Sequence, residues 1–145
     1  MQRPATVVLV EDERSVRDVL GRWLAESGWI VVVCATFHEA KAYLAVNTPD
    51  LLVTDIRLDD YNGLQLVVQM EEKQARASCL VITAHDDPVL RKEAERRHAR
   101  YMVKPFGRTD FLAEIEHLAA DESPTARVLT AARPWALTRF EKRPH

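Results

Sequence analysis

The amino-acid sequence predicts an α/β fold, a doubly wound sheet of five parallel strands with helices on both faces. Five short apolar runs are rich in Val, Ile and Leu and lack polar alternation, which is typical of strands covered on both faces. An amphipathic segment follows each run, so strand and helix alternate five times. Such alternation favours parallel strands joined by right-handed crossovers.

Recognisable signals mark several ends of these segments. The first helix carries an apolar stripe and stops at Ser27-Gly28. Thr36 and Glu39 form a capping box at the start of the second helix, and Asp87-Pro88 opens the fourth. The expected strands cover residues 6–10, 29–34, 50–54, 79–83 and 100–103. The expected helices cover residues 14–27, 36–46, 62–74, 86–98 and 107–120.

One domain accounts for this pattern. We expect it to cover residues 1–120, followed by a tail over 121–145 with room for short helical turns. The net charge of −2 does not favour nucleic acid or an anionic membrane as a partner, and no apolar stretch approaches the ~20 residues that span a bilayer. Cys34 and Cys79 lie in apolar runs, as buried thiols in a reducing compartment do. We therefore expect a cytoplasmic protein.

Polar residues follow four of the five expected strands. In a parallel sheet the carboxyl ends of the strands meet at one edge, where ligands bind. If strands one, three, four and five are neighbours, their polar residues share a pocket. These residues are Glu11 and Asp12, Asp55, Thr83 with Ala84, and Lys104. For Glu11 and Asp12, a position at a helix N-terminus explains the acids equally well.

Three carboxylates in one pocket repel one another, and a divalent cation removes that conflict. Oxygen ligands in small number suit Mg²⁺. Lys104 adds a positive charge and Thr83 a hydroxyl. A carboxylate beside Mg²⁺, a lysine and a hydroxyl indicates phosphoryl chemistry, with Asp55 attacking phosphorus in line.

Four motifs carry a resemblance to a known family. They are "VVLVEDE", "LLVTDIRLDDYNGL", "LVITAH" and "YMVKPF", which stand in this order at the usual separations. The sequence over residues 5–120 resembles the receiver domain of two-component response regulators. The resemblance implies the flavodoxin-like strand order 2-1-3-4-5. It also implies phosphorylation by a sensor histidine kinase or a histidine phosphotransfer protein.

The resemblance implies a metal and phosphoryl site. Asp55 resembles the phospho-acceptor, Asp12 the direct Mg²⁺ ligand, and Glu11 the acid that holds the metal through water. The backbone carbonyl of Arg57 would be a further ligand, and Lys104 resembles the phosphate-binding lysine. The domain would therefore assist its own phosphorylation and slow dephosphorylation without being an enzyme that turns over a separate substrate.

The resemblance also implies a switch. Thr83 resembles the hydroxyl that moves toward the phosphoryl group, with the amide of Ala84 nearby, and Tyr101 resembles the aromatic switch. A half-buried strand tyrosine explains Tyr101 as well. Arg57 and His85 would border the phosphoryl group and tune its hydrolysis. Pro105 resembles the residue that follows the lysine through a cis bond.

Two segments depart from the family pattern. The family often has Met-Pro where this chain has Leu58-Asp59-Asp60, so we expect a less stiff loop after Asp55. The family often has glycine before the fifth strand, whereas residues 96–100 contain none. Without the glycine we expect the fourth helix to end differently or fray.

Three other functions were weighed. A haloacid dehalogenase-like phosphohydrolase also uses a strand-end Asp, but it needs a second Asp where this chain has Arg57. A flavodoxin-like nucleotide-binding module would need a Gly-rich phosphate loop, which does not follow the first strand. A DNA-binding regulator needs a second domain, and the tail is too short for another core. The chain is therefore either a stand-alone receiver or a fragment of a longer DNA-binding regulator.

The fourth helix, fifth strand and fifth helix form the expected output surface. Basic side chains gather over residues 90–100, and acidic side chains lie on the fifth helix, among them Asp110, Glu114 and Glu116. Two ordinary solvated helix faces explain this distribution. A phosphorylation-linked homodimer that sets one stripe against the other explains it too. We expect no direct binding of nucleic acid by this chain.

Overall fold

A computed structural model describes residues 5–120 and the backbone of residues 137–139. Its main sheet is parallel, in the order β7-β6-β3-β1-β2-β8. The strands are β1 (Thr6–Val10), β2 (Ile30–Cys34), β3 (Leu51–Asp55), β6 (Ser78–Thr83), β7 (Arg100–Val103) and β8 (Leu137–Arg139). The five predicted strands therefore occur in the predicted order 2-1-3-4-5, which confirms the fold class.

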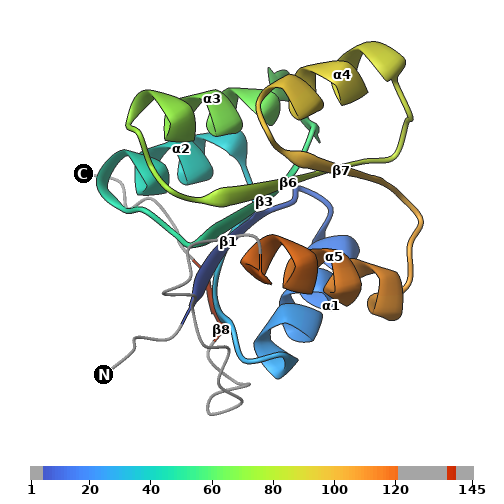
Figure 1. The fold of residues 1–145 in the computed structure, drawn as a ribbon. Coiled ribbons are helices and arrows are strands. Elements are labelled where there is room, and N and C mark those ends of the chain that lie inside the picture. Colours follow the sequence, from blue (N-terminus) through green and yellow to red (C-terminus); the bar gives the residue numbers. More distant parts are fainter. Residues whose placement is uncertain (1–4, 121–136, 140–145) are drawn as a thin grey trace.

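Helices cover both faces of the sheet. They are α1 (Arg14–Glu26), α2 (Phe37–Val46), α3 (Leu64–Glu72), α4 (Pro88–Arg96) and α5 (Arg108–Ala120). Helices α1 and α5 lie on one face, and α2, α3 and α4 lie on the other (Figure 1). Each face has its own apolar core, with Trp29 and Phe111 buried in one and Met70 buried in the other. This double burial explains why the strand sequences are apolar without alternation.

The chain between β3 and α3 differs from the predicted helix over 62–74. It forms a small antiparallel hairpin of β4 (Arg57–Leu58) and β5 (Tyr61–Asn62). The Asn62 side chain accepts a hydrogen bond from the backbone N–H of Leu64 at 2.8 Å, which satisfies a donor at the start of α3. The helix therefore begins two residues later than the pattern suggested.

Helix α4 ends in an ordered motif without glycine, so of the two expected outcomes, a different end or fraying, fraying is not observed. The N–H of His98 donates to the carbonyl of Glu95, and the N–H of Ala99 donates to the carbonyl of Ala94. This is the Schellman arrangement, and His98 occupies its left-handed position with φ 59°. Gln74 holds the same position after α3 with φ 54°. A residue with a left-handed backbone therefore follows both α3 and α4, although neither residue is glycine.

Little of the expected tail falls within the described residues. The backbone of 137–139 forms β8, which pairs with β2 in parallel, with Leu137 opposite Val31. The helical turns expected elsewhere in the tail lie outside the part of the chain that the structure describes. Cys34 and Cys79 are both buried and are not joined in a disulfide. Among the described residues, no helix is long and apolar enough to cross a bilayer.

Candidate functional site

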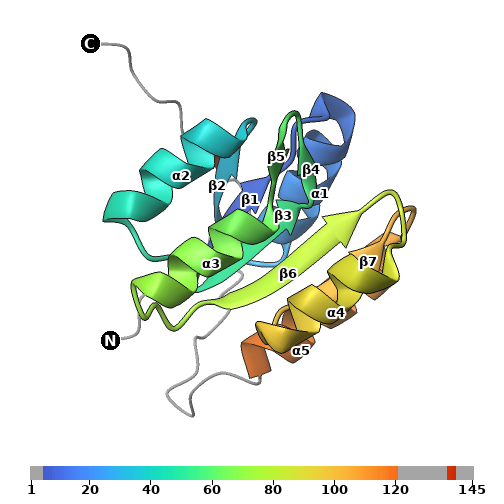
Figure 2. The same ribbon diagram turned by 90° about the horizontal axis from the view of Figure 1, so that it is seen from above.

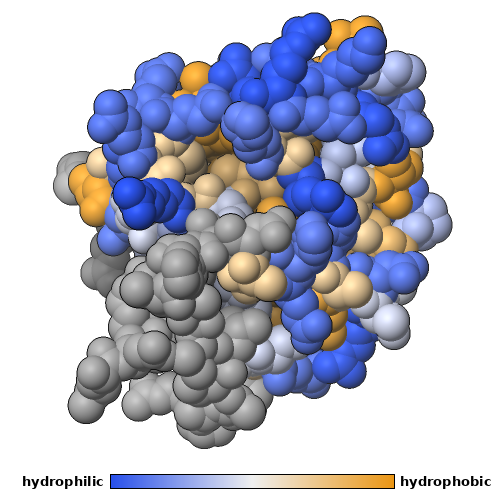
Figure 3. Space-filling view, in the orientation of Figure 1, coloured by the Kyte–Doolittle hydropathy of each residue, from blue (hydrophilic) through white to orange (hydrophobic). Residues whose placement is uncertain are grey.

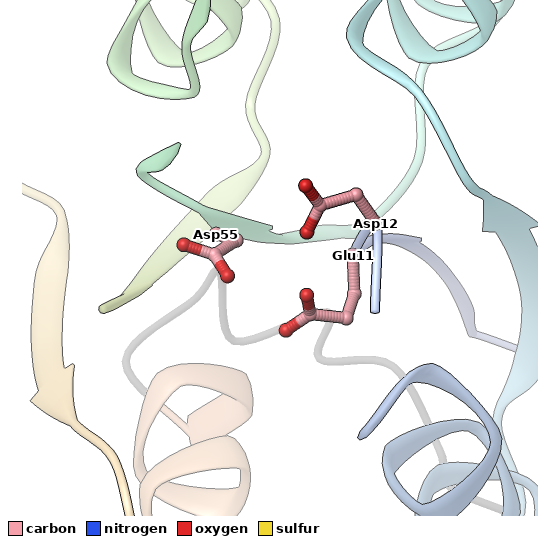
Figure 4. Close-up of side chains that lie close together, drawn as sticks. All are labelled: Glu11, Asp12 and Asp55. Carbon is pink, nitrogen blue, oxygen red and sulfur yellow. The ribbon is translucent and has the colours of Figure 1, made fainter. Parts of the chain in front are cut away.

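Three carboxylates meet at the carboxyl ends of neighbouring strands. Glu11 and Asp12 directly follow β1, and Asp55 is the last residue of β3, which pairs with β1. The three side chains point toward one another, and one oxygen from each lies within 4.8 Å of the others (Figure 4). Glu11 is fully buried, Asp55 is 5% exposed and Asp12 faces solvent. Strand pairing therefore brings together acids 43 and 44 positions apart in the chain.

Lys104 binds two members of the acidic cluster, which consists of Glu11, Asp12 and Asp55. It follows β7, and its Nζ donates to Glu11 Oε1 and to Asp55 Oδ2, both at 2.7 Å. Its backbone N–H donates to the carbonyl of Thr83 at 2.7 Å, which ties it to the end of β6. The peptide bond from Lys104 to Pro105 is cis, as the resemblance implied. One ammonium group thus bridges two carboxylates from different strands.

Burial dominates the electrostatics of Glu11. Burial raises its pKa, and the charge of Asp55 raises it further, while the hydrogen bond from Lys104 lowers it; the result is a pKa of about 7. The pKa of Lys104 is lowered by burial, but its hydrogen bonds to Asp55 and Glu11 outweigh that effect and raise it above the ordinary value. Burial is therefore the main reason for the raised pKa of Glu11, and the hydrogen bond from Lys104 offsets it only in part.

Glu11 also acts at the start of α1. Its Oε2 accepts a hydrogen bond from the backbone N–H of Glu13 at 3.1 Å, and Glu13 is the N-cap residue of the helix. Glu11 therefore serves both roles that the sequence suggested: Oε2 contacts the start of the helix and Oε1 contacts Lys104 in the acidic cluster. The backbone carbonyl of Asp12 accepts a hydrogen bond from Arg17.

Arg17 supports the acidic cluster from α1, and the sequence analysis missed it. Its guanidinium is buried, and Nη1 donates to the backbone carbonyls of Glu11 at 3.0 Å and Asp12 at 3.3 Å. These bonds fasten the turn that carries both acids. A signal was present in the sequence, because Arg17 lies three and seven positions before Leu20 and Leu24, on the core-facing stripe of the helix.

Gly63 is a second residue that the sequence analysis missed. A Cβ atom at this position would lie 2.0 Å from the carbonyl oxygen of Asp55 and 2.7 Å from Thr54 Oγ1. The Gly63 N–H donates to the carbonyl of Ile56 at 2.7 Å, which closes the hairpin after Asp55. Only glycine allows this approach. Its place just after the predicted acceptor loop was the available signal.

The predicted phosphoryl neighbours lie around this edge of the sheet. The backbone N–H of Arg57 donates to Asp55 Oδ1 at 3.0 Å. The side chains of Arg57, Ala84 and His85 are exposed, whereas Thr83 is buried. The Thr83 hydroxyl donates to the backbone carbonyl of His85 at 3.1 Å and accepts from the His85 N–H at 3.2 Å. It is thus engaged with its own loop.

Tyr101 contacts the same loop further along. Its hydroxyl accepts a hydrogen bond from the backbone N–H of Asp87 at 3.0 Å, and the guanidinium of Arg91 lies 4.4 Å from the centre of its ring. Asp87 is also the N-cap of α4, because its side chain accepts from the N–H groups of Val89 and Leu90. Tyr101 therefore links β7 to the start of α4, and it is half-buried, as the strand-tyrosine interpretation requires.

The basic residues near the output surface pair within the chain. Arg100 forms two hydrogen bonds with Glu114, at 2.7 and 3.1 Å, and Arg97 pairs with Glu71 at 2.6 Å and Glu93 at 2.9 Å. The surface over α3 and α4 is mainly hydrophilic (Figure 3). These pairs satisfy charges that a dimer was expected to match between subunits. Arg97, Arg100 and Glu114 are thus engaged within the chain, and the dimer stays a prediction.

Comparison with known proteins agrees with this geometry. The family described as "Response regulator receiver domain" matches residues 7–116. The DNA-binding transcriptional regulator NtrC of Salmonella typhimurium is 37% identical over 120 residues, which cover 80% of this chain and 25% of that protein. The response regulator MprA of Mycobacterium sp. (strain KMS) is 31% identical over 132 residues, 88% of this chain and 57% of that protein. The chain therefore spans about a quarter of NtrC and just over half of MprA.

Solved structures show the same fold. The non-phosphorylated HemR receiver domain from Leptospira biflexa is 28% identical, with a TM-score of 0.76, over 83% of this chain and 98% of that one. A CheY-like response regulator receiver domain from Methanospirillum hungatei JF-1 is 21% identical, with a TM-score of 0.73, over 79% of this chain and 93% of that one.

Proposed function

Because the chain belongs to the response regulator receiver domain family, we propose that it is a Mg²⁺-dependent switch that is phosphorylated on Asp55. The observation that carries this proposal is the acidic cluster with Lys104 at the carboxyl edge of the sheet. Asp55 is held at both oxygens, by Lys104 Nζ and by the N–H of Arg57. A carboxylate fixed in this way is oriented for attack before a phosphoryl donor arrives.

The donor set fits Mg²⁺. The candidate ligands are all oxygens, and one oxygen from each of the three carboxylates lies within 4.8 Å of the others, which supports a shared cation. Asp12 and Asp55 would bind the ion directly, Glu11 through water, and Arg57 through its backbone carbonyl. When bound, Mg²⁺ supplies positive charge that neutralises the oxygens of the transferring phosphoryl group.

The side chains of the chain then carry the transfer. An Asp55 oxygen attacks the phosphorus of a phosphohistidine, the P–N bond breaks, and the leaving imidazole keeps the electron pair and takes up a proton. The Lys104 ammonium group exchanges its hydrogen bond to the Asp55 carboxylate for one to a phosphoryl oxygen. The Thr83 hydroxyl exchanges its bond to the His85 backbone for one to a phosphoryl oxygen. Later, water attacks the phosphorus, the bond between phosphorus and the Asp55 oxygen breaks, and inorganic phosphate leaves, which restores the carboxylate.

Movement of Thr83 would reach the output surface through its loop. Thr83 is bonded to His85, and two residues on, Asp87 donates to the hydroxyl of Tyr101. A phosphoryl group that draws Thr83 inward therefore disturbs the contact that holds Tyr101 to the start of α4. The phosphoryl group shifts the population only as far as it interacts better with the rearranged state.

The phosphoryl donor is a sensor histidine kinase or a histidine phosphotransfer protein. An apolar groove beside the acidic cluster is a suitable binding surface for it. A groove of about 310 Å³ beside Lys104 is lined by Val16, Val19 and Trp23 of α1 and by Phe106. An apolar helix face of the donor that fills this groove would bring a histidine to the adjacent acceptor. Apolar burial would supply affinity, while the acidic cluster supplies the chemistry.

Phosphorylation of Asp55 can be tested directly. Incubation with acetyl phosphate and Mg²⁺ should add one phosphoryl group by intact-mass analysis, and Asp55→Asn should abolish it. Asp60→Asn is the matched control, because Asp60 is an exposed acid in the following loop and should keep the label. Labelling of Asp55→Asn, or omission of Mg²⁺ without effect, would overturn the proposal.

The receiver serves either a stand-alone protein or a longer regulator. The NtrC relatives are named as DNA-binding regulators, and this chain matches only about a quarter of their length. We therefore infer a signal-receiving role for this chain, with any DNA-binding role in residues outside the match. The length of the natural gene distinguishes the two arrangements.

A further inference from the structure

A stack of aromatic rings joins the loop after Asp55 to the start of α2. The rings of Tyr61 and Phe37 are parallel within 3°, with centroids 4.6 Å apart. His38 meets the same Tyr61 ring edge-on, at 4.7 Å and 77°. Tyr61 belongs to β5, and Phe37 and His38 begin α2, so the β4–β5 hairpin lies beside the start of that helix (Figure 2).

The hairpin is too small to hold its own position. It contains two residue pairs, Arg57 with Asn62 and Leu58 with Tyr61, and Asp59 turns the chain with φ 55°. A ribbon this short is not stable by itself in water. Leu58 and Tyr61 are cross-strand partners, so their side chains leave the same face of the hairpin. Leu58 enters the core and Tyr61 stacks on Phe37, which anchors that face.

The position of the hairpin matters to the acceptor. Arg57 is in the first strand of the hairpin, and its N–H donates to Asp55 Oδ1 at 3.0 Å. Its carbonyl is the proposed backbone ligand of Mg²⁺. Since Mg²⁺ demands a near-ideal octahedral geometry, a small displacement of this carbonyl weakens binding.

We propose that Tyr61 is a positioning residue for the metal site, because its stack on Phe37 holds the β4–β5 hairpin and thereby holds Arg57 beside the acidic cluster. The inference rests on the proposed function of that cluster. The expectation of a less stiff loop in place of Met-Pro stays a prediction. On this proposal, the ring stack and the hairpin pairing restrain the loop.

Two substitutions separate the ring from its hydroxyl. Tyr61→Ala removes the stack, and Tyr61→Phe keeps it. Isothermal titration of the metal-free proteins with Mg²⁺ should show a Kd raised about threefold to tenfold in Tyr61→Ala, as the loss of a stacked pair predicts. Tyr61→Phe should keep the original Kd. Val89→Ala is the control for loss of an exposed apolar side chain, because Val89 is 74% exposed on α4.

Amide hydrogen exchange provides the second readout. The N–H of Arg57 should exchange faster in Tyr61→Ala than in Tyr61→Phe, while amides of β6 should be unaffected. If Tyr61→Ala does not fold, Tyr61→Leu replaces it, since leucine keeps apolar bulk without a planar stack. The inference is overturned if the Kd for Mg²⁺ of Tyr61→Ala, or of Tyr61→Leu where that variant replaces it, equals the Kd of Tyr61→Phe. Absence of Mg²⁺ binding by the unmodified protein instead overturns the proposed function.

Discussion

The affinity for Mg²⁺ should depend on pH through Glu11. Burial and the charge of Asp55 raise the pKa of Glu11 to about 7, so near pH 6 only about a tenth of these carboxyl groups are ionised. Mg²⁺ favours the ionised form, and at that pH it must displace the proton. Near pH 8 about nine tenths are already ionised. The apparent Kd should therefore fall about tenfold between pH 6 and pH 8, which corresponds to about 1.4 kcal/mol.

Calorimetric titration with Mg²⁺ at the two pH values measures this ratio. Glu11→Gln is the control, because glutamine keeps the shape but does not titrate, so its Kd should be nearly independent of pH. The control variant retains every other ionisable group of the protein, so any pH dependence that it lacks is due to Glu11. Equal Kd values for the unmodified protein at both pH values would refute the argument, as would a tenfold change that persists in Glu11→Gln.

The same proton has a consequence for stability. A folded-state pKa raised from 4.5 to about 7 means that the folded protein binds the proton more tightly than the unfolded chain does. The contribution of Glu11 to stability is thus full below about pH 4.5 and is lost as pH rises through about 7. Bound Mg²⁺ offsets this loss. The rise in melting temperature caused by Mg²⁺, relative to protein with a chelator, should therefore be larger near pH 8 than near pH 6.

Four further outcomes are expected. Glycine in place of His98 or Gln74 should raise the free energy of unfolding by about 1 kcal/mol and the melting temperature by roughly 3–5 °C, because both residues hold a left-handed backbone; an unchanged midpoint would contradict this. Arg57→Ala and His85→Ala should change the lifetime of the acyl phosphate without changing the Kd for Mg²⁺, and identical decay rates would remove both from this role. Gly63→Ala should weaken Mg²⁺ binding and lower the melting temperature, because its Cβ would lie 2.0 Å from a backbone carbonyl oxygen; normal values of both would refute the close approach. Beryllofluoride with Mg²⁺ should raise the dimer fraction in sedimentation velocity, and a monomer unaffected by it would leave the charged helix faces as solvated surface.

Local pattern was sufficient for the layout of the fold and for much of the site. Apolar runs without alternation predict strands buried on both faces, and five alternations with helices require parallel strands. Parallel strands bring their carboxyl ends to one edge. Position at strand ends placed Glu11, Asp12, Asp55 and Lys104 at this edge, and the strand order that the family resemblance implied made their convergence predictable, although they come from segments up to 93 residues apart.

Features that depend on contacts between distant segments were decided only by the tertiary structure. The stack of Tyr61 on Phe37 depends on where the hairpin meets α2, and the pairing of β8 with β2 joins residues about a hundred positions apart. Periodicity reports which face of an element is buried, but not which side chain on another element it meets.

The sequence determines which residues can carry a charge, and the fold determines their pKa values and their ion-pair partners. The residues themselves show that Glu11 is an acid and Arg100 is a base. Only the folded chain sets the pKa of Glu11 near 7, because that value depends on complete burial and on Asp55 nearby. Only the folded chain pairs Arg100 with Glu114 instead of leaving it for a partner. Desolvation and Coulomb energies depend on distance in space, and sequence separation does not determine that distance.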